Sequence, residues 1–253
     1  MRVVHLITTY NEAENVVLLI PKLQKFYKNH PKIKFVTLFV DDSRDATPKI
    51  IKRFQKKDTS ILLAPGHSRG LGAAMIRGYH YALARLNPDI IITNEADFAY
   101  DHTRIPLMVK KIGEGYDVIV ASRHTPGGTT QGWTWSRHLN HWLANTFFAS
   151  WVAGGNYVSD HNGEFRAIRV KGVLDQITWT GFPSGFAFFN YLLFKLHQIT
   201  PKFYEFPITY RFRTLGESKV SFNPKYLVSY LKSILEYIYV CLKIRLHSTL
   251  KRK

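Results

Sequence analysis

The strongest constraint on the fold is a regular alternation of short apolar segments with segments of helix length. Strand-like runs rich in Val, Ile and Leu occupy 2–8, 34–40, 60–64, 89–93 and 117–122, and helical spacing of apolar residues fills the stretches between them. Parallel neighbouring strands need crossover connections of about this length. The alternation therefore predicts an α/β fold with a mainly parallel sheet flanked by helices.

Acidic and polar side chains recur where these strands end. The first strand leads into 8–15, "TTYNEAEN", and the second into 40–47, "VDDSRDAT". Open parallel sheets bind their ligands beyond the carboxyl ends of the strands. A binding site at this edge of the sheet is therefore the first functional hypothesis.

The fourth strand ends by delivering two carboxylates, Glu95 and Asp97, separated by one alanine. In an extended segment, residues two apart point to the same side. Two like charges on one side repel each other unless a positive group lies between them, and a hard divalent cation is one such group. The alternative interpretation is a solvated strand end whose acids lie in a turn.

Other groups at the same edge suit a nucleotide sugar. Asp41 or Asp42 can accept hydrogen bonds from a base or a ribose, and the glycine-rich helix start at 70–72 can offer backbone N–H groups to phosphates. A cation held by Asp97 would neutralise a diphosphate and stabilise it as a leaving group. Arg123 suits bidentate phosphate recognition, although an ordinary surface arginine is the alternative.

The net charge of +17 predicts an anionic partner: a nucleic acid, an acidic membrane or a phosphorylated substrate. The basic residues are dispersed and no nucleic-acid-reading module is recognisable, so nucleic acid is not an expected partner. The single cysteine, Cys241, excludes a disulfide framework and a cysteine zinc site. The N-terminus has no signal-peptide layout and no apolar stretch is long enough to span a bilayer, which predicts a cytoplasmic protein.

The second half of the chain has a different pattern. A Gly/Thr loop at 124–135 precedes segments that read as a helix (137–154), a strand (163–170), a helix (181–197) and a strand (202–212). The chain finishes in an apolar helix with interleaved basic residues. Its stripe of Leu227, Leu231, Ile234, Ile238 and Leu242 predicts either packing on the core or an amphipathic helix lying on an acidic membrane.

Several motifs together resemble family 2 glycosyltransferases, and among these the polyprenyl- or dolichol-phosphate mannosyltransferases. They are "TTYNEAEN", "VDDSRDAT", "EADFAYDHTRIPLMV", "VIVASRHTPGG", "SDHNGEFRAIR" and "FPITYRFRTLGESKV", in this order along the chain. The resemblance implies a GT-A fold, in which a Rossmann-like domain binds a nucleotide sugar with Mg²⁺ or Mn²⁺. It also implies a catalytic domain at 1–220 and a basic, amphipathic membrane-surface helix at 221–253.

The resemblance assigns roles to individual residues. Nucleotide binding is implied for Thr9, Tyr10, Glu12, Asp41, Asp42, Arg77, Glu95 and Ala96, and metal binding for Glu95 and Asp97. Catalytic positions are Asp97, Arg123, Arg137, Arg213 and Lys219, and the acceptor phosphate is expected at Arg123, Arg137 and Arg166. The sequence departs from the family pattern in four places. Glu95 replaces the first Asp of "DxD", and "VDDSRDAT" is one residue shorter than the usual "VDDGSxDGT", which leaves the nucleoside contact open between Asp41 and Asp42. Ala99 stands where some relatives have a polar ligand, and "DHNGEFR" replaces the usual Thr/Ser-Gly stretch.

The implied reaction is an inverting, metal-dependent transfer of a hexose to a polyprenyl or dolichyl phosphate. GDP-mannose is the first donor candidate, and UDP-glucose or another UDP-hexose is the next. The acceptor phosphate is already ionised, so alignment and charge stabilisation suffice and no general base is needed. The expected location is peripheral, on the inner face of a membrane, with or without a membrane-anchoring partner protein. The alternatives are transfer to a glycan or other hydroxyl, which needs a base, and a non-catalytic sugar-nucleotide-binding scaffold.

Overall fold

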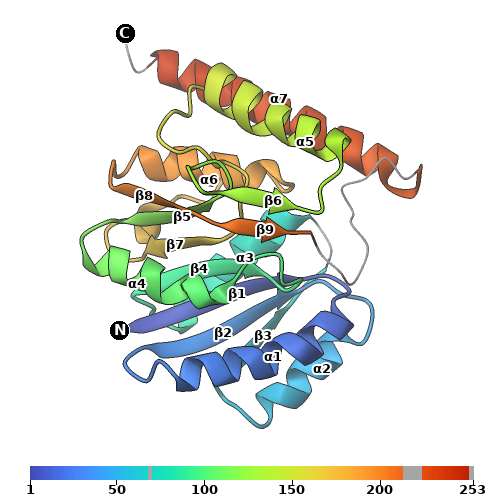
Figure 1. Ribbon diagram of the computed structural model, residues 1–253, viewed down its shortest axis with the longest axis vertical. Helices are drawn as coiled ribbons and strands as arrows, with labels where there is room; N and C mark the ends of the chain where they lie inside the picture. The colour runs from blue at the N-terminus through green and yellow to red at the C-terminus, as the bar shows by residue number, and fades with distance from the viewer. Residues whose placement is uncertain (68–69, 213–223, 251–253) are drawn as a thin grey trace.

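The computed structural model describes residues 1–67, 70–212 and 224–250, and a seven-stranded sheet forms its centre. Helices cover both faces of this sheet (Figure 1). The strands are β1 (Arg2–Thr9), β2 (Lys34–Asp41), β3 (Ile61–Pro65), β4 (Ile90–Glu95), β5 (Val118–Ser122), β7 (Arg166–Arg169) and β8 (Phe203–Pro207), with β6 (Thr129–Gln131) and β9 (Thr209–Arg211) in a second sheet. The α-helices are α1 (Ala13–Lys28), α2 (Thr47–Gln55), α3 (Leu71–Arg85), α4 (Ile105–Gly113), α5 (Trp135–Trp142), α6 (Ala187–His197) and α7 (Pro224–Leu250). Shorter helical segments are η1 (His102–Arg104), η2 (Leu143–Val152) and η3 (Leu174–Gln176).

The predicted parallel sheet is confirmed, with one exception. The strand order is β3-β2-β1-β4-β7-β5-β8, and every neighbouring pair is parallel except the two that involve β7. The chain leaves β5 at the carboxyl edge of the sheet, forms β6, α5 and η2, and returns as β7 in the opposite direction. The start of β7 therefore lies at the same edge as the ends of the parallel strands.

The core lies on both faces of the sheet, as expected for helix-covered strands. On one face, strand residues such as Leu6 and Ile91 pack with α3 and α6. On the other face, Ile92 packs with α4, and Ile7 packs with α1 and α2. Alternate residues of β1 and β4 thus serve two separate apolar layers, which fixes the side to which each polar residue at the strand ends points.

Three predicted elements have different bounds in the structure. The strand predicted at 202–212 divides at Pro207 and Ile208, and its second half pairs as β9 with β6, where the sequence predicted only a loop. The helix predicted at 137–154 begins at Trp135 and changes to π-helix geometry at Leu143. The helix predicted from residue 181 begins only at Ala187.

Helix α7 has one packed side and one exposed side. Tyr237, Val240, Cys241 and Ile244 are buried against residues of η2 and α6. The expected apolar stripe is not this packed face, because Leu231 and Leu242 of that stripe are 51% and 49% exposed. Among the described residues, no helix combines the length and apolarity needed to cross a bilayer. The predicted domain boundary at residue 220 lies outside the described residues.

Candidate active site

The first polar cluster of the site joins the ends of β1 and β2. These strands pair in register, so Thr9 lies opposite Asp41. The Thr9 hydroxyl donates to Asp41 Oδ1 at 2.7 Å, and the Ser43 hydroxyl donates to the same oxygen at 2.6 Å. Both Thr9 and Asp41 are buried, so Asp41 presents a fixed carboxylate to the space beyond the strands.

The loops that follow β1 and β2 are hydrogen-bonded to each other. Asn11 has a φ of 57°, a left-handed conformation that asparagine tolerates. Its backbone N–H donates to Ser43 Oγ at 2.7 Å, and its side-chain oxygen accepts from the Arg44 N–H at 2.9 Å. The Glu12 N–H donates to Thr47 Oγ1 at 2.9 Å. Two loops predicted to bind the nucleoside thus form one rigid wall, with Tyr10 half-buried beside them.

Asp42 has a different partner from Asp41. It forms an ion pair with Arg77 of α3, and this pair is largely buried on the Asp42 side. The guanidinium lies over Gly66, where a Cβ atom would come within 2.2 Å of Arg77 Cζ. The structure therefore places Arg77 at the predicted nucleotide site. The close approach of its guanidinium explains why residue 66 is a glycine.

The glycine-rich start of α3 does not offer the free N–H groups that the sequence suggested. The N–H groups of Gly72 and Ala73 donate to the Ser184 carbonyl oxygen at 2.7 and 3.4 Å. A Cβ atom on Gly72 would lie 2.3 Å from the Pro183 carbonyl oxygen. This glycine is therefore needed for close approach of the segment before α6, and the N–H groups of Gly72 and Ala73 are occupied by an acceptor of the protein.

Glu95 and Asp97 lie at and just beyond the end of β4, at the centre of the same edge. The chain turns sharply at Phe98, which has a φ of 62°, and Asp97 Oδ1 accepts from the Ala99 N–H at 3.0 Å. Asp97 is buried and Glu95 is half-buried, with Ala96 packed in the core between them. Carboxylate oxygens are the donors that Mg²⁺ and Mn²⁺ prefer, so this pair fits the predicted cation.

A third carboxylate, Glu164, lies beside this pair. It precedes β7 and is buried, and its Oε1 accepts from the Thr8 hydroxyl at 3.0 Å. Burial, together with the nearby charge of Glu95, raises the pKa of Glu164 well above its usual range. The sequence prediction did not include Glu164, because its position at the sheet edge depends on the antiparallel course of β7.

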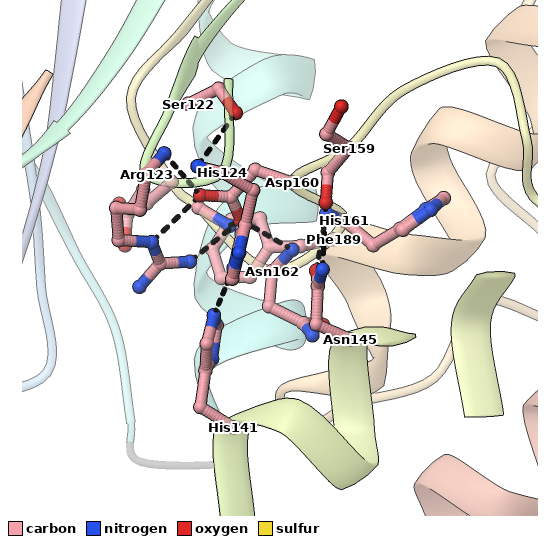
Figure 2. Close-up of polar contacts among 12 residues, drawn as sticks. Ser122, Arg123, His124, His141, Asn145, Ser159, Asp160, His161, Asn162 and Phe189 are labelled. Atoms are coloured by element: carbon pink, nitrogen blue, oxygen red, sulfur yellow. Dashed lines mark hydrogen bonds and ion pairs between the residues drawn. The ribbon is translucent and has the colours of Figure 1, made fainter. Parts of the chain in front are cut away.

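Arg123, at the end of β5, is held by a buried ion pair with Asp160 (Figure 2). Its Nε donates to Asp160 Oδ2 and its Nη2 to Oδ1, both at 2.7 Å, and its backbone N–H adds a bond of 3.0 Å. Burial alone would raise the pKa of Asp160, but the Arg123 guanidinium holds that pKa well below its usual range. Asp160 is a positioning group that the sequence analysis missed.

Trp133 lies between the two arginines predicted to meet the acceptor phosphate. The Arg123 guanidinium carbon lies 5.6 Å from a Trp133 ring centroid, and that of Arg137 lies 5.3 Å from it. Arg137 also lies 4.7 Å from the Phe212 ring, and Arg123 lies 5.4 Å from Tyr210. Aromatic faces thus bring the two guanidinium groups together, and the charge of Arg123 is balanced by Asp160.

Two histidines complete this region. His124 Nε2 and His141 Nε2 are 2.8 Å apart, which requires that one ring donates and the other accepts (Figure 2). With Asp160 they form the one compact group of possible metal ligands found among the described residues. Asp160, however, already accepts from Arg123 through both oxygens and from the Gly163 N–H at 3.0 Å, so no metal is assigned there.

Of the three remaining predicted basic residues, Arg166 is the one that the structure describes. Arg166 is buried, and its Nη1 and Nη2 donate to the carbonyl oxygens of Phe189 and His161 at 2.8 and 2.7 Å. The structure thus brings Arg166 to the interior of the site, on the side of α6. Arg213 and Lys219 lie outside the described residues.

Comparisons with known proteins identify a family from the sequence and a shared fold from the structure. The model of glycosyl transferase family 2 matches residues 5–175. The chain is 30% identical over 224 residues to an undecaprenyl-phosphate mannosyltransferase of Micrococcus luteus, covering 87% of this chain and 88% of that protein. It is 29% identical to the polyprenol monophosphomannose synthase of Mycolicibacterium smegmatis, covering 87% and 81%. The crystal structure of glucosyl-3-phosphoglycerate synthase from Mycobacterium tuberculosis with Mn²⁺, UDP and phosphoglyceric acid shares the fold, with a TM-score of 0.61 at 15% identity over 95% of this chain and 78% of that one.

Proposed function

Because the chain belongs to glycosyl transferase family 2 and is a glycosyltransferase, we propose that it transfers a hexose from a nucleoside diphosphate sugar to a polyprenyl or dolichyl phosphate, with inversion. GDP-mannose is the first donor candidate, since the two relatives described above are named for mannose transfer. UDP-glucose or another UDP-hexose comes next. One observation carries the proposal: two pairs of charged residues lie at the same edge of the sheet. The carboxylates are Glu95 and Asp97, and the arginines are Arg123 and Arg137.

The donor would lie along the ends of β1, β2 and β4. Thr9, Asp41 and the wall formed by their loops are suited to the nucleoside, and Glu95 and Asp97 are suited to hold Mg²⁺ or Mn²⁺ beside the diphosphate. A bound cation would neutralise the charge that develops on the departing diphosphate. The M. tuberculosis enzyme of the same fold was crystallised with Mn²⁺ and UDP, which supports a divalent cation and a nucleotide as ligands of this fold.

The acceptor would be an anion rather than a neutral hydroxyl. Arg123 and Arg137 bring two guanidinium groups to one aromatic ring, with Asp160 paired to Arg123, and guanidinium groups suit a phosphate. A hydroxyl acceptor would need a general base, and Asp160 is the carboxylate nearest to Arg123. Asp160 is buried in an ion pair that stabilises its charged form and holds its pKa low, so the carboxylate is a weak base and a poor proton acceptor. Asp160 therefore does not supply the base that a glycan acceptor would need.

The outer helices support action at a membrane surface. Helix α7 lies beside α5 and η2 at the β8 end of the sheet (Figure 1). Both carry exposed apolar stripes: Trp135, Leu139, Trp142, Leu143, Phe147 and Trp151 on one, and Val228, Leu231, Leu235, Tyr239, Leu242 and Leu246 on the other. With exposed Lys232, Lys243 and Arg245, these stripes fit an acidic lipid surface, and we assign the protein to the inner face of a membrane, bound directly or through an anchoring protein.

A donor screen tests the proposed reaction. GDP- and UDP-sugars are supplied with a short polyprenyl phosphate, with and without Mn²⁺, and the lipid-linked product is measured. Asp97→Asn should abolish turnover while the protein stays folded, and Asp175→Asn, an exposed acid in η3, should leave turnover unchanged. Full activity of Asp97→Asn would remove the metal hypothesis, and sugar-nucleotide binding without any transfer would favour the scaffold alternative.

A further inference from the structure

We propose that Glu164 is a third carboxylate of the divalent-cation site, acting beside Glu95 and Asp97 through the water shell of the ion. The inference rests on the proposed function in one respect only, namely that a divalent cation binds at the end of β4. It adds a residue of this chain that neither the sequence motifs nor the comparisons assign. The argument comes from strand register, from burial and from charge.

Continuing the register of β4 and β7 past the end of their ladder sets Glu164 across from Glu95. Strands β4 and β7 pair antiparallel, and the ladder between them ends at Thr93 and Arg166. Two residues further, the same register sets Glu95 opposite Glu164, and the Thr93 hydroxyl donates to the Glu164 carbonyl oxygen. On the other side of β4, Glu95 is the partner of Thr8. Side chains on paired positions share one face of the sheet, about 5 Å apart at Cβ.

The Glu164 side chain is held at one end and lacks a partner at the other. It is 1% exposed, and Oε1 accepts from the Thr8 hydroxyl at 3.0 Å. Its Oε2 atom is buried and has no hydrogen-bond partner within the part of the chain that the structure describes. A buried carboxylate oxygen without a donor is unfavourable, so this atom calls for a donor beyond the described residues, and a cation-bound water would supply one.

The charges near Glu164 leave room for a divalent cation. Like charges directly opposite each other on paired strands are destabilising. The positive group on the same face is Arg166, two residues along β7, but its Nη1 and Nη2 bind the carbonyl oxygens of Phe189 and His161. With Glu164 in its charged form, the three carboxylates and this guanidinium sum to a formal charge of about −2, which Mg²⁺ or Mn²⁺ would balance. A bound cation would oppose the burial and the Glu95 charge that otherwise raise the pKa of Glu164.

The chemistry of these ions explains why Glu164 acts through water. Mg²⁺ usually keeps several water molecules and takes only one or two carboxylates together with substrate phosphates. Glu95 and Asp97 already supply these carboxylates in the proposed site. Glu164 Oε2 would accept a hydrogen bond from a cation-bound water, which orients that water and adds negative charge. Outer groups of this kind commonly change metal affinity by about 10- to 100-fold when they are removed.

The test measures Mn²⁺ binding in the absence of any sugar nucleotide, by the electron paramagnetic resonance signal of free Mn²⁺. Glu164→Gln keeps the shape of the side chain and should weaken Mn²⁺ binding by about tenfold. Thr8→Val removes only the hydroxyl that holds Oε1 and should weaken binding roughly threefold. Glu114→Gln, an exposed acid that follows α4, removes the same charge far from the site and should bind Mn²⁺ like the wild type.

Unfolding of the same proteins with and without Mn²⁺ gives a second readout. The rise in Tm on adding Mn²⁺ should be smaller for Glu164→Gln than for the wild type and for Glu114→Gln. Wild-type Mn²⁺ affinity in Glu164→Gln, with affinity lost in Asp97→Asn, would overturn this inference and leave the proposed function standing. Wild-type protein that binds no Mn²⁺ would overturn both. If Glu164→Gln does not fold, Thr8→Val decides, and unchanged affinity there overturns the inference.

Discussion

At the scale of single residues, the buried pair of Arg123 and Asp160 fixes the guanidinium that the acceptor is proposed to meet. Both side chains are almost fully buried, at 6% and 0% exposure. Removing one partner of such a pair leaves the other charge buried and unpaired, which typically costs about 3–5 kcal/mol. A structural residue that the motifs did not mark is thus expected to matter as much for stability as for activity.

Asp160→Asn should therefore lower the free energy of unfolding by about 3 kcal/mol or more, measured by urea denaturation. Asp117→Asn is the matched control, because Asp117 also pairs with an arginine, Arg169, but at a more exposed site. Its loss should be clearly smaller, since exposed pairs contribute about 0–1 kcal/mol. Equal losses in the two variants would show that burial of the Arg123 pair has no special effect on stability.

His5 makes stability depend on pH. It lies in the centre of β1, with Nδ1 2.7 Å from the Tyr27 hydroxyl oxygen. Burial, with a smaller effect of His102, lowers the pKa of His5 from 6.5 to about 3. Below about pH 6.5 His5 is protonated in the unfolded chain but stays neutral in the folded chain. The free energy of unfolding therefore decreases as the pH falls toward 3, by up to about 1.4 kcal/mol per pH unit.

His5→Gln removes this titration. Urea denaturation between about pH 6.5 and about pH 4 should show a shallower fall in the free energy of unfolding for the variant than for the wild type. The two proteins are compared by the slope of the free energy of unfolding against pH. Absolute stabilities are not compared, because the substitution also changes packing at a fully buried site. The same slope in both proteins would mean that His5 is protonated, or exposed, in the folded state.

At the scale of elements, the start of α3 shows how a glycine motif can mislead. A glycine-rich turn before a helix suggests phosphate binding, yet Gly72 is required by the close approach of the Pro183 carbonyl oxygen. Gly72→Ala should therefore destabilise the protein, by about 1–3 kcal/mol, through displacement of that segment. Gly113→Ala in α4 has no atom within 4 Å of the new Cβ and should be neutral or stabilising by up to about 1 kcal/mol.

Thermal unfolding of these two variants separates a packing role from a binding role. A Gly72→Ala protein as stable as the wild type but impaired in nucleotide binding would restore the phosphate hypothesis. Loss of stability with the expected sign would confirm that the glycine serves the contact between α3 and the segment before α6. The opposite shift expected in Gly113→Ala controls for the general effect of replacing a glycine.

The sequence predicted those elements whose signals are local. Alternation of strands and helices gave β1 to β5 and α1 to α4, because each buried strand is a short apolar run and each helix has its own apolar period. Pairings between distant segments were not predictable in this way. Strand β9 leaves the main sheet to pair with β6, and the direction of β7 follows from the excursion through α5 and η2.

The same distinction applies to the site. Glu95 and Asp97 could be found from the sequence, because their spacing and the preceding apolar run are local. Asp160 and Glu164 could not be assigned, because their partners Arg123 and Thr8 are 37 and 156 residues away. The sequence does show two acids, Asp160 and Glu164, close together just before a strand. They can be assigned to the site only once β7 is known to begin at the carboxyl edge of the sheet.

At the scale of the whole molecule, the site and the exposed outer helices are connected through α5. Arg137 of this helix lies against Trp133 and Phe212 on its inner side. Trp135 and Trp142 of the same helix are 77% and 43% exposed. If the outer side of α5 binds a membrane surface, the anionic headgroup of a lipid in that membrane comes within reach of the arginines. The net charge of +17 would add attraction to acidic lipids, an effect that salt weakens.

This arrangement predicts that the outer tryptophans control binding to vesicles. Trp135→Ser with Trp151→Ser should weaken sedimentation with anionic phospholipid vesicles by at least about tenfold, because burial of an aromatic side chain in the interface contributes about 1.5–3 kcal/mol. Leu18→Ser is the matched control, since Leu18 is 48% exposed on α1, away from α5 and α7 (Figure 1), and it should bind like the wild type. Binding to vesicles of neutral lipids should be weaker for every variant and less sensitive to salt. If the double variant binds anionic vesicles as tightly as Leu18→Ser does, charge alone holds the protein at the surface, and α5 does not position the acceptor for Arg137.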